Sequence, residues 1–128
     1  MEKKELVIRK CMKCGAIVKE IEPCNCNCNC GIICCNEEMK KLIPNSVDAA
    51  IEKHVPTYTV EGEKIIARVN HVMEEDHLIE WISIVFNNKE VTTYFKPGDE
   101  PVAKCKYVKG STIYAYCNKH GLWKKDVE

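Results

Sequence analysis

Histidine and cysteine side chains that could bind one metal ion are concentrated near the C-terminal end, in the segment YCNKHGLW at 116–123. There Cys117 and His120 stand three positions apart and are followed by Gly121, so a tight loop could direct a thiolate and an imidazole at one ion. The other three of the four histidines lie upstream, in EKHVP at 52–56 and HVMEEDH at 71–77. Because every histidine of the chain falls in one of these motifs, we interpret them as one site. Its predicted ligands are His54, His71, His77, Cys117 and His120.

This set of donors favours iron over zinc. Zinc sites usually have four ligands in a tetrahedron, whereas five donors suit a metal ion that accepts six ligands and would leave one position open. A single histidine would more often be a hydrogen-bonded structural residue, and Cys117 alone would read as a buried thiol at a strand end. The occurrence of all four histidines and Cys117 in three motifs favours a metal site over these simpler interpretations. Cys105 has no such partner motif, and we expect it to pack in the core.

A second group of possible ligands lies at the N-terminal end, where eight of the ten cysteines precede residue 36. Cys11 and Cys14 have the C-x-x-C spacing of a metal-binding knuckle, and Cys34 and Cys35 form a second pair. Four thiolates in a tetrahedron suit iron or zinc equally. The segment is too short to form a core, so metal must supply its folding free energy, on the order of 10–16 kcal/mol for structural zinc.

Taken together, these motifs resemble the superoxide reductase (desulfoferrodoxin) family. EKHVP, HVMEEDHLIEWI at 71–82, FKPGD at 95–99 and YCNKHGLWK at 116–124 occur in the order found in that family. The resemblance implies a mononuclear iron site (Fe²⁺/Fe³⁺) with four equatorial histidines and axial Cys117. At the open position opposite the sulfur, superoxide would be reduced to hydrogen peroxide without release of oxygen. It therefore implies an oxidoreductase.

The N-terminal CMKCG and the Cys34-Cys35 pair are similar to the desulforedoxin-type domain of the same family. The resemblance implies a second mononuclear iron, held in a rubredoxin-like centre by Cys11, Cys14, Cys34 and Cys35. It also implies rubredoxin as the electron donor and a homodimer. We accordingly expect an iron domain at 1–39 and a catalytic domain at 40–128.

Two charged residues of the EKHVP motif are candidates for catalytic roles. Lys53 would guide the anionic substrate, since a cation at the mouth of a site raises the local concentration of anions. Glu52 matches the family residue that can occupy the sixth position of oxidised iron. For either residue the simpler interpretation is a solvated surface charge.

The remaining sequence predicts a mainly β protein with short strands separated by turns. Runs at 5–9 and 16–21 flank the first cysteine knuckle, residues 40–50 form a linker, and Ser46 could cap a helical turn through Ala50. Strands of a second module are predicted at 57–60, 64–70, 78–86, 90–95, 103–108 and 112–116. Such spacing favours an antiparallel sandwich, and the resemblance implies an immunoglobulin-like one.

Composition excludes several classes of protein. The 19 basic and 19 acidic side chains give zero net charge, which argues against nucleic-acid binding and against a membrane-surface role. No apolar run approaches the roughly 20 residues of a membrane-spanning helix. The start, MEKKE, lacks the apolar core of a signal peptide, so a cytoplasmic location is expected.

The run CNCNCNC at 24–30 departs from the family pattern by adding four thiols between the two ligand pairs. Three interpretations remain open: an insert without a role, a site for an additional soft metal, or replacement of one predicted ligand or formation of disulfides. Alternative functions are also open, namely a rubredoxin-like electron carrier, a structural metal-binding protein, or an enzyme that dismutates superoxide.

Overall fold

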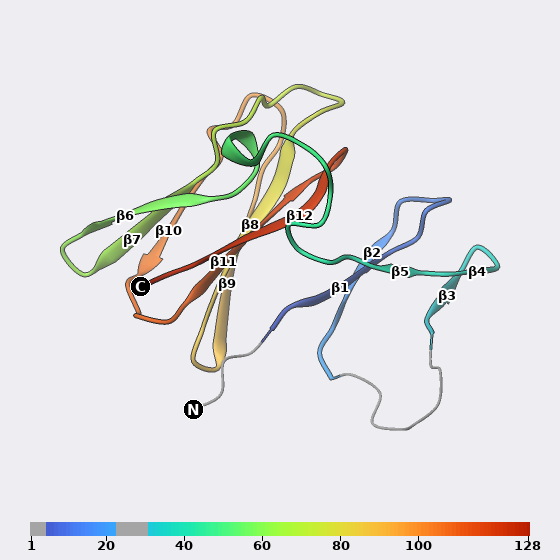
Figure 1. Cartoon of the computed structure of the whole chain (residues 1–128), viewed down its shortest axis with the longest axis horizontal. Helices are drawn as coiled ribbons and strands as arrows, with labels where there is room; N and C mark the ends of the chain where they lie inside the picture. Colours follow the sequence, from blue (N-terminus) through green and yellow to red (C-terminus); the bar gives the residue numbers. More distant parts are fainter. Residues whose placement is uncertain (1–4, 23–30) are drawn as a thin grey trace. The chain divides into compact units, whose positions relative to one another are not determined.

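The structure is a computed structural model that describes residues 5–22 and 31–128 of the chain. The described residues form antiparallel β-sheets and one short 3-10 helix, which confirms the prediction of a mainly β protein (Figure 1). They divide into two compact units, Glu5–Ile43 and Pro44–Glu128, which are described separately below. The cysteine run at 24–30 lies outside the described residues.

The larger unit is a β-sandwich of two antiparallel sheets. One sheet has the order β10-β7-β6, made of β6 (Thr57–Glu61), β7 (Lys64–Arg68) and β10 (Val102–Lys106). The other has the order β12-β11-β8-β9, made of β8 (Ile79–Phe86), β9 (Lys89–Tyr94), β11 (Thr112–Cys117) and β12 (Gly121–Asp126). This arrangement confirms the predicted antiparallel sandwich.

Alternate residues of the strands supply the core between the two sheets. Ile65 and Ala67 of β7 pack in one cluster with Ile82 and Ile84 of β8, and all are fully buried. The predicted core residue Trp81 is instead half-buried, and its ring stacks on Tyr116 at a centroid distance of 5.8 Å. Cys105 is half-buried and packs against the core, as expected.

Six strands of the sandwich were predicted close to their observed positions, but β12 was missed. No strand is predicted there because GLWKKD lacks the alternation of apolar and polar residues that marks a half-buried strand. In the structure Leu122 and Trp123 are both buried, and β12 pairs with β11 along its whole length, from Gly121 to Asp126.

The helical turn before the sandwich also differs from the prediction. The turn at Pro44-Asn45 is present, with Asn45 at a φ of 59°. The helix, however, is η1 (Ile51–Lys53), which begins after Ala50 and has no side-chain cap. The sequence placed it at 46–50 because Ser46 is a good capping residue. The observed position puts Lys53 and His54 at the C-terminal end of the turn.

The smaller unit contains two short sheets. One has the order β2-β1-β5, made of β1 (Val7–Lys10), β2 (Ile17–Glu20) and β5 (Lys40–Lys41). The other is the hairpin of β3 (Ile33–Cys34) and β4 (Glu37–Glu38). The linker was predicted to start at residue 40, but Lys40 and Lys41 pair with β1. The backbone of Leu42 also donates to the carbonyl of Ile8 at 2.9 Å.

Candidate metal centres

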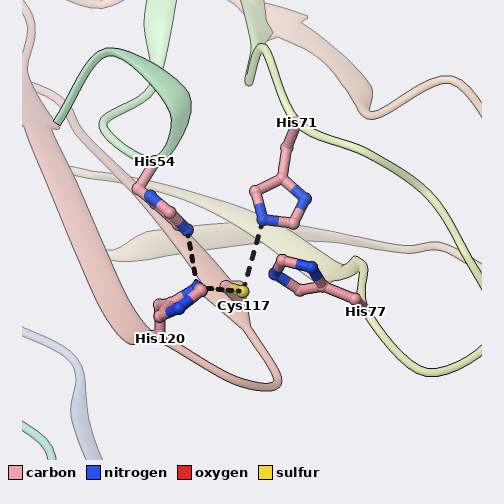
Figure 2. Close-up of side chains that lie close together, drawn as sticks. All are labelled: His54, His71, His77, Cys117 and His120. Carbon is pink, nitrogen blue, oxygen red and sulfur yellow. Dashed lines mark hydrogen bonds between the residues drawn. The ribbon is translucent and has the colours of Figure 1, made fainter. Parts of the chain in front are cut away.

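Five side chains meet at one end of the sandwich, and they are the five predicted ligands of the catalytic iron. Their donor atoms all lie within 4.8 Å of one another (Figure 2). His54 follows η1, His71 and His77 come from the segment between β7 and β8, and Cys117 ends β11. His120 lies in the turn between β11 and β12. The sandwich thus brings together residues that are far apart in the sequence.

Backbone carbonyl groups fix the orientation of two of the imidazole rings. Nδ1 of His54 lies 2.7 Å from the carbonyl oxygen of Ala50, and Nδ1 of His71 lies 2.6 Å from that of Val72. Since a carbonyl oxygen can only accept, each Nδ1 carries the proton and each Nε2 is left with a free lone pair. The free Nε2 atoms point into the cluster: that of His54 is 3.1 Å from Nδ1 of His120, and that of His71 is 3.4 Å from Sγ of Cys117. This is the tautomer that a metal ligand requires.

The other two histidines complete the set of donors. Nε2 of His77 is buried and has no hydrogen-bond partner among the described residues. A buried polar atom without a partner is costly, and a metal ion at the centre of the cluster would satisfy it. His120 contributes Nδ1, which lies 3.7 Å from Sγ of Cys117. The residues therefore fit a metal ion held by three Nε2 atoms, one Nδ1 atom and one sulfur.

The side chain of Asn118 joins the two loops that carry most of the donors. Its Oδ1 accepts from the backbone of Leu78 at 3.0 Å, and its Nδ2 donates to the carbonyl of Asp76 at 2.9 Å. Lys119 adds an exposed ion pair to Asp76 at 3.9 Å. This role of Asn118 was not predicted, although the residue lies inside the C-x-x-H motif and its amide can both accept and donate hydrogen bonds.

The loop between the cysteine and His120 requires a glycine directly after it. Gly121 has a φ of 84°, a conformation that side chains disfavour. A Cβ atom at this position would also stand 3.3 Å from Cγ2 of Val47. Behind the loop, Nε1 of Trp123 donates to the carbonyl oxygen of His120 at 3.0 Å, and its ring stacks on His54 at a centroid distance of 5.0 Å.

Burial controls the protonation of these ligands. It raises the pKa of the Cys117 thiol, and the backbone N–H groups of Lys119 and His120 only partly oppose this effect. It lowers the pKa of His71 and His120, which favours the neutral imidazole that binds metal. A metal ion entering the site would consequently have to displace the proton of Cys117.

The cluster opens to solvent on its histidine side through a hollow of about 670 Å³. Of the described residues, those that line it include all four histidines but not Cys117, which is fully buried. The hollow also contains Lys53, Asp48 and Glu74 but not Glu52. Lys53 thus lines the hollow above the histidines, and its role as an anion guide stays a prediction. The two carboxylates at the mouth were not anticipated, because neither belongs to the quoted ligand motifs as a donor.

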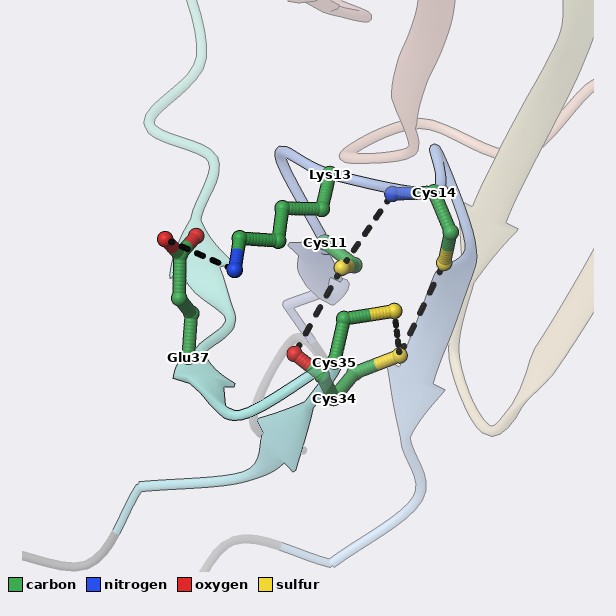
Figure 3. A network of polar contacts seen from close by, with 6 residues as sticks. All are labelled: Cys11, Lys13, Cys14, Cys34, Cys35 and Glu37. Carbon is green, nitrogen blue, oxygen red and sulfur yellow. Dashed lines mark hydrogen bonds and ion pairs between the residues drawn. The ribbon is translucent and has the colours of Figure 1, made fainter.

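The four predicted cysteines of the smaller unit also come together. The sulfur atoms of Cys11, Cys14, Cys34 and Cys35 lie within 4.8 Å of one another, and all four residues are free thiols (Figure 3). In the first knuckle the backbone of Cys14 donates to Sγ of Cys11 at 3.5 Å. The knuckle closes by a bond of 2.9 Å from the backbone of Gly15, whose φ is 81°, to the carbonyl oxygen of Cys11.

Adjacent cysteines can face one centre here because of the turn between β3 and β4. Cys34 pairs with Glu37, which leaves Cys35 and Asn36 as a two-residue loop. Their φ angles of 54° and 62° are both positive, as in a type I′ hairpin turn. In a plain strand, neighbouring side chains point to opposite faces. The turn brings Sγ of Cys35 to 3.8 Å from that of Cys34.

The thiols of this cluster differ in acidity. The N–H donor of Cys14 lowers the pKa of Cys11 to about 6. Cys34 keeps its proton in hydrogen bonds to the sulfur atoms of Cys14 and Cys11, which raises its pKa to about 12. Four sulfur atoms this close share protons in the absence of a metal, and a cation that replaces the protons would relieve the crowding of charge. An all-thiolate tetrahedron of this kind fits iron or zinc.

These features define the class of protein: a β-sandwich metalloprotein whose two donor groups, four histidines with one cysteine and four cysteines, are consistent with two mononuclear iron sites. Among the described residues, the single helix spans only three residues, and no helix could cross a membrane.

Comparison with known proteins identifies the family. The desulfoferrodoxin family profile matches residues 46–126. The desulfoferrodoxin of Syntrophotalea carbinolica is 38% identical over 126 residues, covering 95% of this chain and 97% of that protein. The chain therefore belongs to the desulfoferrodoxin family, whose members bind iron.

Solved structures are also similar. The superoxide reductase of Treponema pallidum superimposes with a TM-score of 0.71, covering 95% of this chain and 99% of that one at 21% identity. This likeness supports the fold. The one-iron superoxide reductase of Giardia intestinalis is 29% identical with a TM-score of 0.52, covering 60% of this chain and 98% of that one.

Proposed function

We propose that the protein is a superoxide reductase of the two-iron type. The observation that carries the proposal is the convergence of His54, His71, His77, Cys117 and His120 within 4.8 Å, beneath a hollow that opens on the histidine side. The similarity to the Giardia enzyme and membership of the desulfoferrodoxin family support the same activity. In this proposal residues 40–128 carry the reductase and residues 1–39 carry a four-cysteine iron centre.

Iron bound by the five donors would supply the single electron that reduces superoxide. The balance is one superoxide, one electron and two protons giving one hydrogen peroxide. Cys117 is fully buried and does not line the hollow, so its thiolate would hold the metal from the side away from solvent. The four histidines line the hollow and Cys117 does not, so the residues would hold the metal between a buried sulfur and the solvent-facing imidazoles.

The chain's own residues would perform the remaining tasks. Lys53 lines the hollow and attracts the anionic substrate. The backbone N–H groups of Lys119 and His120 stabilise the Cys117 thiolate. The two protons come from solvent, which reaches the centre through the hollow. The role of Glu52 remains a prediction: the residue is exposed on η1 and does not line the hollow.

The test measures how much hydrogen peroxide and oxygen form for each superoxide consumed. Ferrous protein kept reduced under anaerobic conditions should consume pulse-generated superoxide and yield one hydrogen peroxide for each superoxide, with no oxygen. A dismutase would yield one peroxide for every two superoxide molecules and release oxygen, which would exclude the reductase. Zinc as the only metal in protein expressed with ample iron would favour a structural metal protein. Rubredoxin as the donor and a homodimer complete the proposal.

A further inference from the structure

One face of the β10-β7-β6 sheet carries a group of unpaired cations. In this sheet Lys64 stands opposite Lys106, Ile66 opposite Lys104, and Arg68 opposite Val102. Residues directly opposite each other in an antiparallel pair project from the same face. Ile65, Ala67 and Ala103 alternate with them and point into the core. Hence the four cations share the outer face of the sheet. We call it the basic face: Lys64, Arg68, Lys104 and Lys106.

The four cations are exposed, and none of them forms an ion pair with another described residue. Two of them, Lys64 and Lys106, stand directly opposite each other, an arrangement that destabilises a sheet. Glu61 of β6 stands opposite Lys64, and Glu63 lines a hollow together with three of these lysines, so the face and its border have a net charge of +4 − 2 = +2. The whole chain is neutral, so this concentration does not reflect a general excess of lysine.

Protection of a sheet edge does not account for the basic face. Lysines on an edge strand discourage pairing with another chain, and β10 is an edge strand. Lys64 and Arg68, however, belong to β7, which lies between β10 and β6 and has no free edge. Next to the face, a hollow of about 300 Å³ is lined by Glu63, Lys64, Lys104, Cys105 and Lys106. The face is therefore both charged and partly concave.

The basic face leads directly to the histidine-cysteine centre. Strand β7 ends at Arg68, and the chain continues through Val69 and Asn70 to His71. Asn70 and His71 both line the hollow above the centre. Three residues span at most about 10 Å. A protein bound at the Arg68 end of the basic face would consequently lie within about 10 Å of the His71 backbone, beside the site that must receive an electron after each turnover.

We propose that the basic face is the docking surface for an acidic electron-donor protein. The proposal rests on the proposed function, because a superoxide reductase consumes one electron for each superoxide. Charge complementarity selects an acidic partner. Transient electron-transfer complexes have small interfaces, below about 1,200 Å² in total, so the basic face would form the charged part of such a contact. Complementary charges would act mainly on the rate of association.

The experiment uses the iron-loaded full chain and an acidic rubredoxin as the probe. Lys104→Glu with Lys106→Glu reverses two exposed charges of the face. A matched control, Lys89→Glu with Lys125→Glu, makes the same change of net charge at two exposed lysines outside it. We expect the bimolecular oxidation of reduced rubredoxin to slow by about tenfold or more at low salt in the first variant only. The difference should shrink as salt is raised.

Binding measured separately distinguishes this proposal from the proposed function. Zinc-substituted rubredoxin, which transfers no electron, should bind the wild-type chain and the control variant but not the face variant in NMR titrations. If superoxide reduction failed while this binding pattern held, the docking surface would stand and the enzyme assignment would fall. Equal binding by both variants, or capture of a DNA oligonucleotide in place of rubredoxin, would overturn the docking proposal.

Discussion

The two candidate metal centres are built in opposite ways. The histidine-cysteine centre draws its donors from positions between 54 and 120, and packed sheets hold the loops that carry them. The four-cysteine centre draws its donors from two tight turns whose sheets contain strands of four residues or fewer. Cys117 is fully buried, whereas Cys14 and Cys35 are exposed. The packed sheets thus position the donors of the first centre. At the second centre, metal binding must itself stabilise the surrounding turns and short strands.

Removal of one ligand of the four-cysteine centre should have the largest effect. Cys11→Ser should abolish the visible absorption of that centre and unfold the smaller unit, because metal binding contributes on the order of 10–16 kcal/mol to such modules. Amide signals of β7, β8 and β11 should stay dispersed in NMR spectra. If the smaller unit kept its dispersed signals without metal, the proposed difference between the centres would be wrong.

Cys117→Ser should give the converse result. Reductase activity should fall below detection, because a hydroxyl does not replace the thiolate as an electron-rich ligand. The sandwich should remain folded, at a cost of about 1–3 kcal/mol for a buried polar group. The spectrum of the four-cysteine centre serves as the internal control and should be unchanged. Retained activity would refute the role of Cys117.

Asn118→Ala tests whether the loops of the sandwich position the donors. Two hydrogen bonds between the loops would be lost, and groups that orient ligands typically contribute 10–100-fold to metal affinity. We expect faster loss of iron from the histidine-cysteine centre to a chelator, with the four-cysteine centre unaffected. Asn88→Ala, at an exposed turn, is the matched control. If both variants released iron at the wild-type rate, Asn118 would have no role in positioning the ligands.

Iron binding at the histidine-cysteine centre should become tighter as pH rises. The pKa of Cys117 is raised, so its thiol is protonated at neutral pH and binding releases one proton. Below that pKa the affinity should increase about tenfold for each pH unit. The pKa values of His71 and His120 are lowered, so these rings add no further proton release near neutral pH. Competition titrations with a chelator between about pH 7 and about pH 8, above the ordinary histidine pKa, measure the slope. A flat profile would mean that Cys117 is not a ligand.

Lys53→Ala should have the smallest effect. The encounter with superoxide should slow at low salt, and the difference should diminish as the Debye length falls from about 10 Å at 0.1 M to about 3 Å at 1 M. Lys53→Arg should restore part of the rate. Asp48 and Glu74 line the same hollow and weaken the positive field, which limits the effect. Asp48→Asn should therefore speed the encounter. If all three variants reacted with superoxide at the wild-type rate, electrostatic guidance by these residues would be refuted.

The sequence predicted most of the fold and all of the donors that the structure brings together. Chemically distinctive residues at fixed spacing, such as Cys117 and His120, can be recognised as candidate metal ligands without a structure. Asn118 was missed because its contacts are to the backbone of a distant loop, and Asp48 because its place at the hollow depends on tertiary packing. Strand β12 was missed because pairing with β11 overrides its weak pattern.

The backbone bonds that hold His54 and His71 have a consequence for electron transfer itself. Each ring is fixed by a carbonyl within its own loop, and Asn118 ties the loop of His77 to that of Cys117. Donor atoms held in this way move little when the charge at their centre changes by one. In the proposed reductase, the structural rearrangement that accompanies oxidation and reduction of the metal would therefore be small, which would lower the activation energy for passing an electron in either direction.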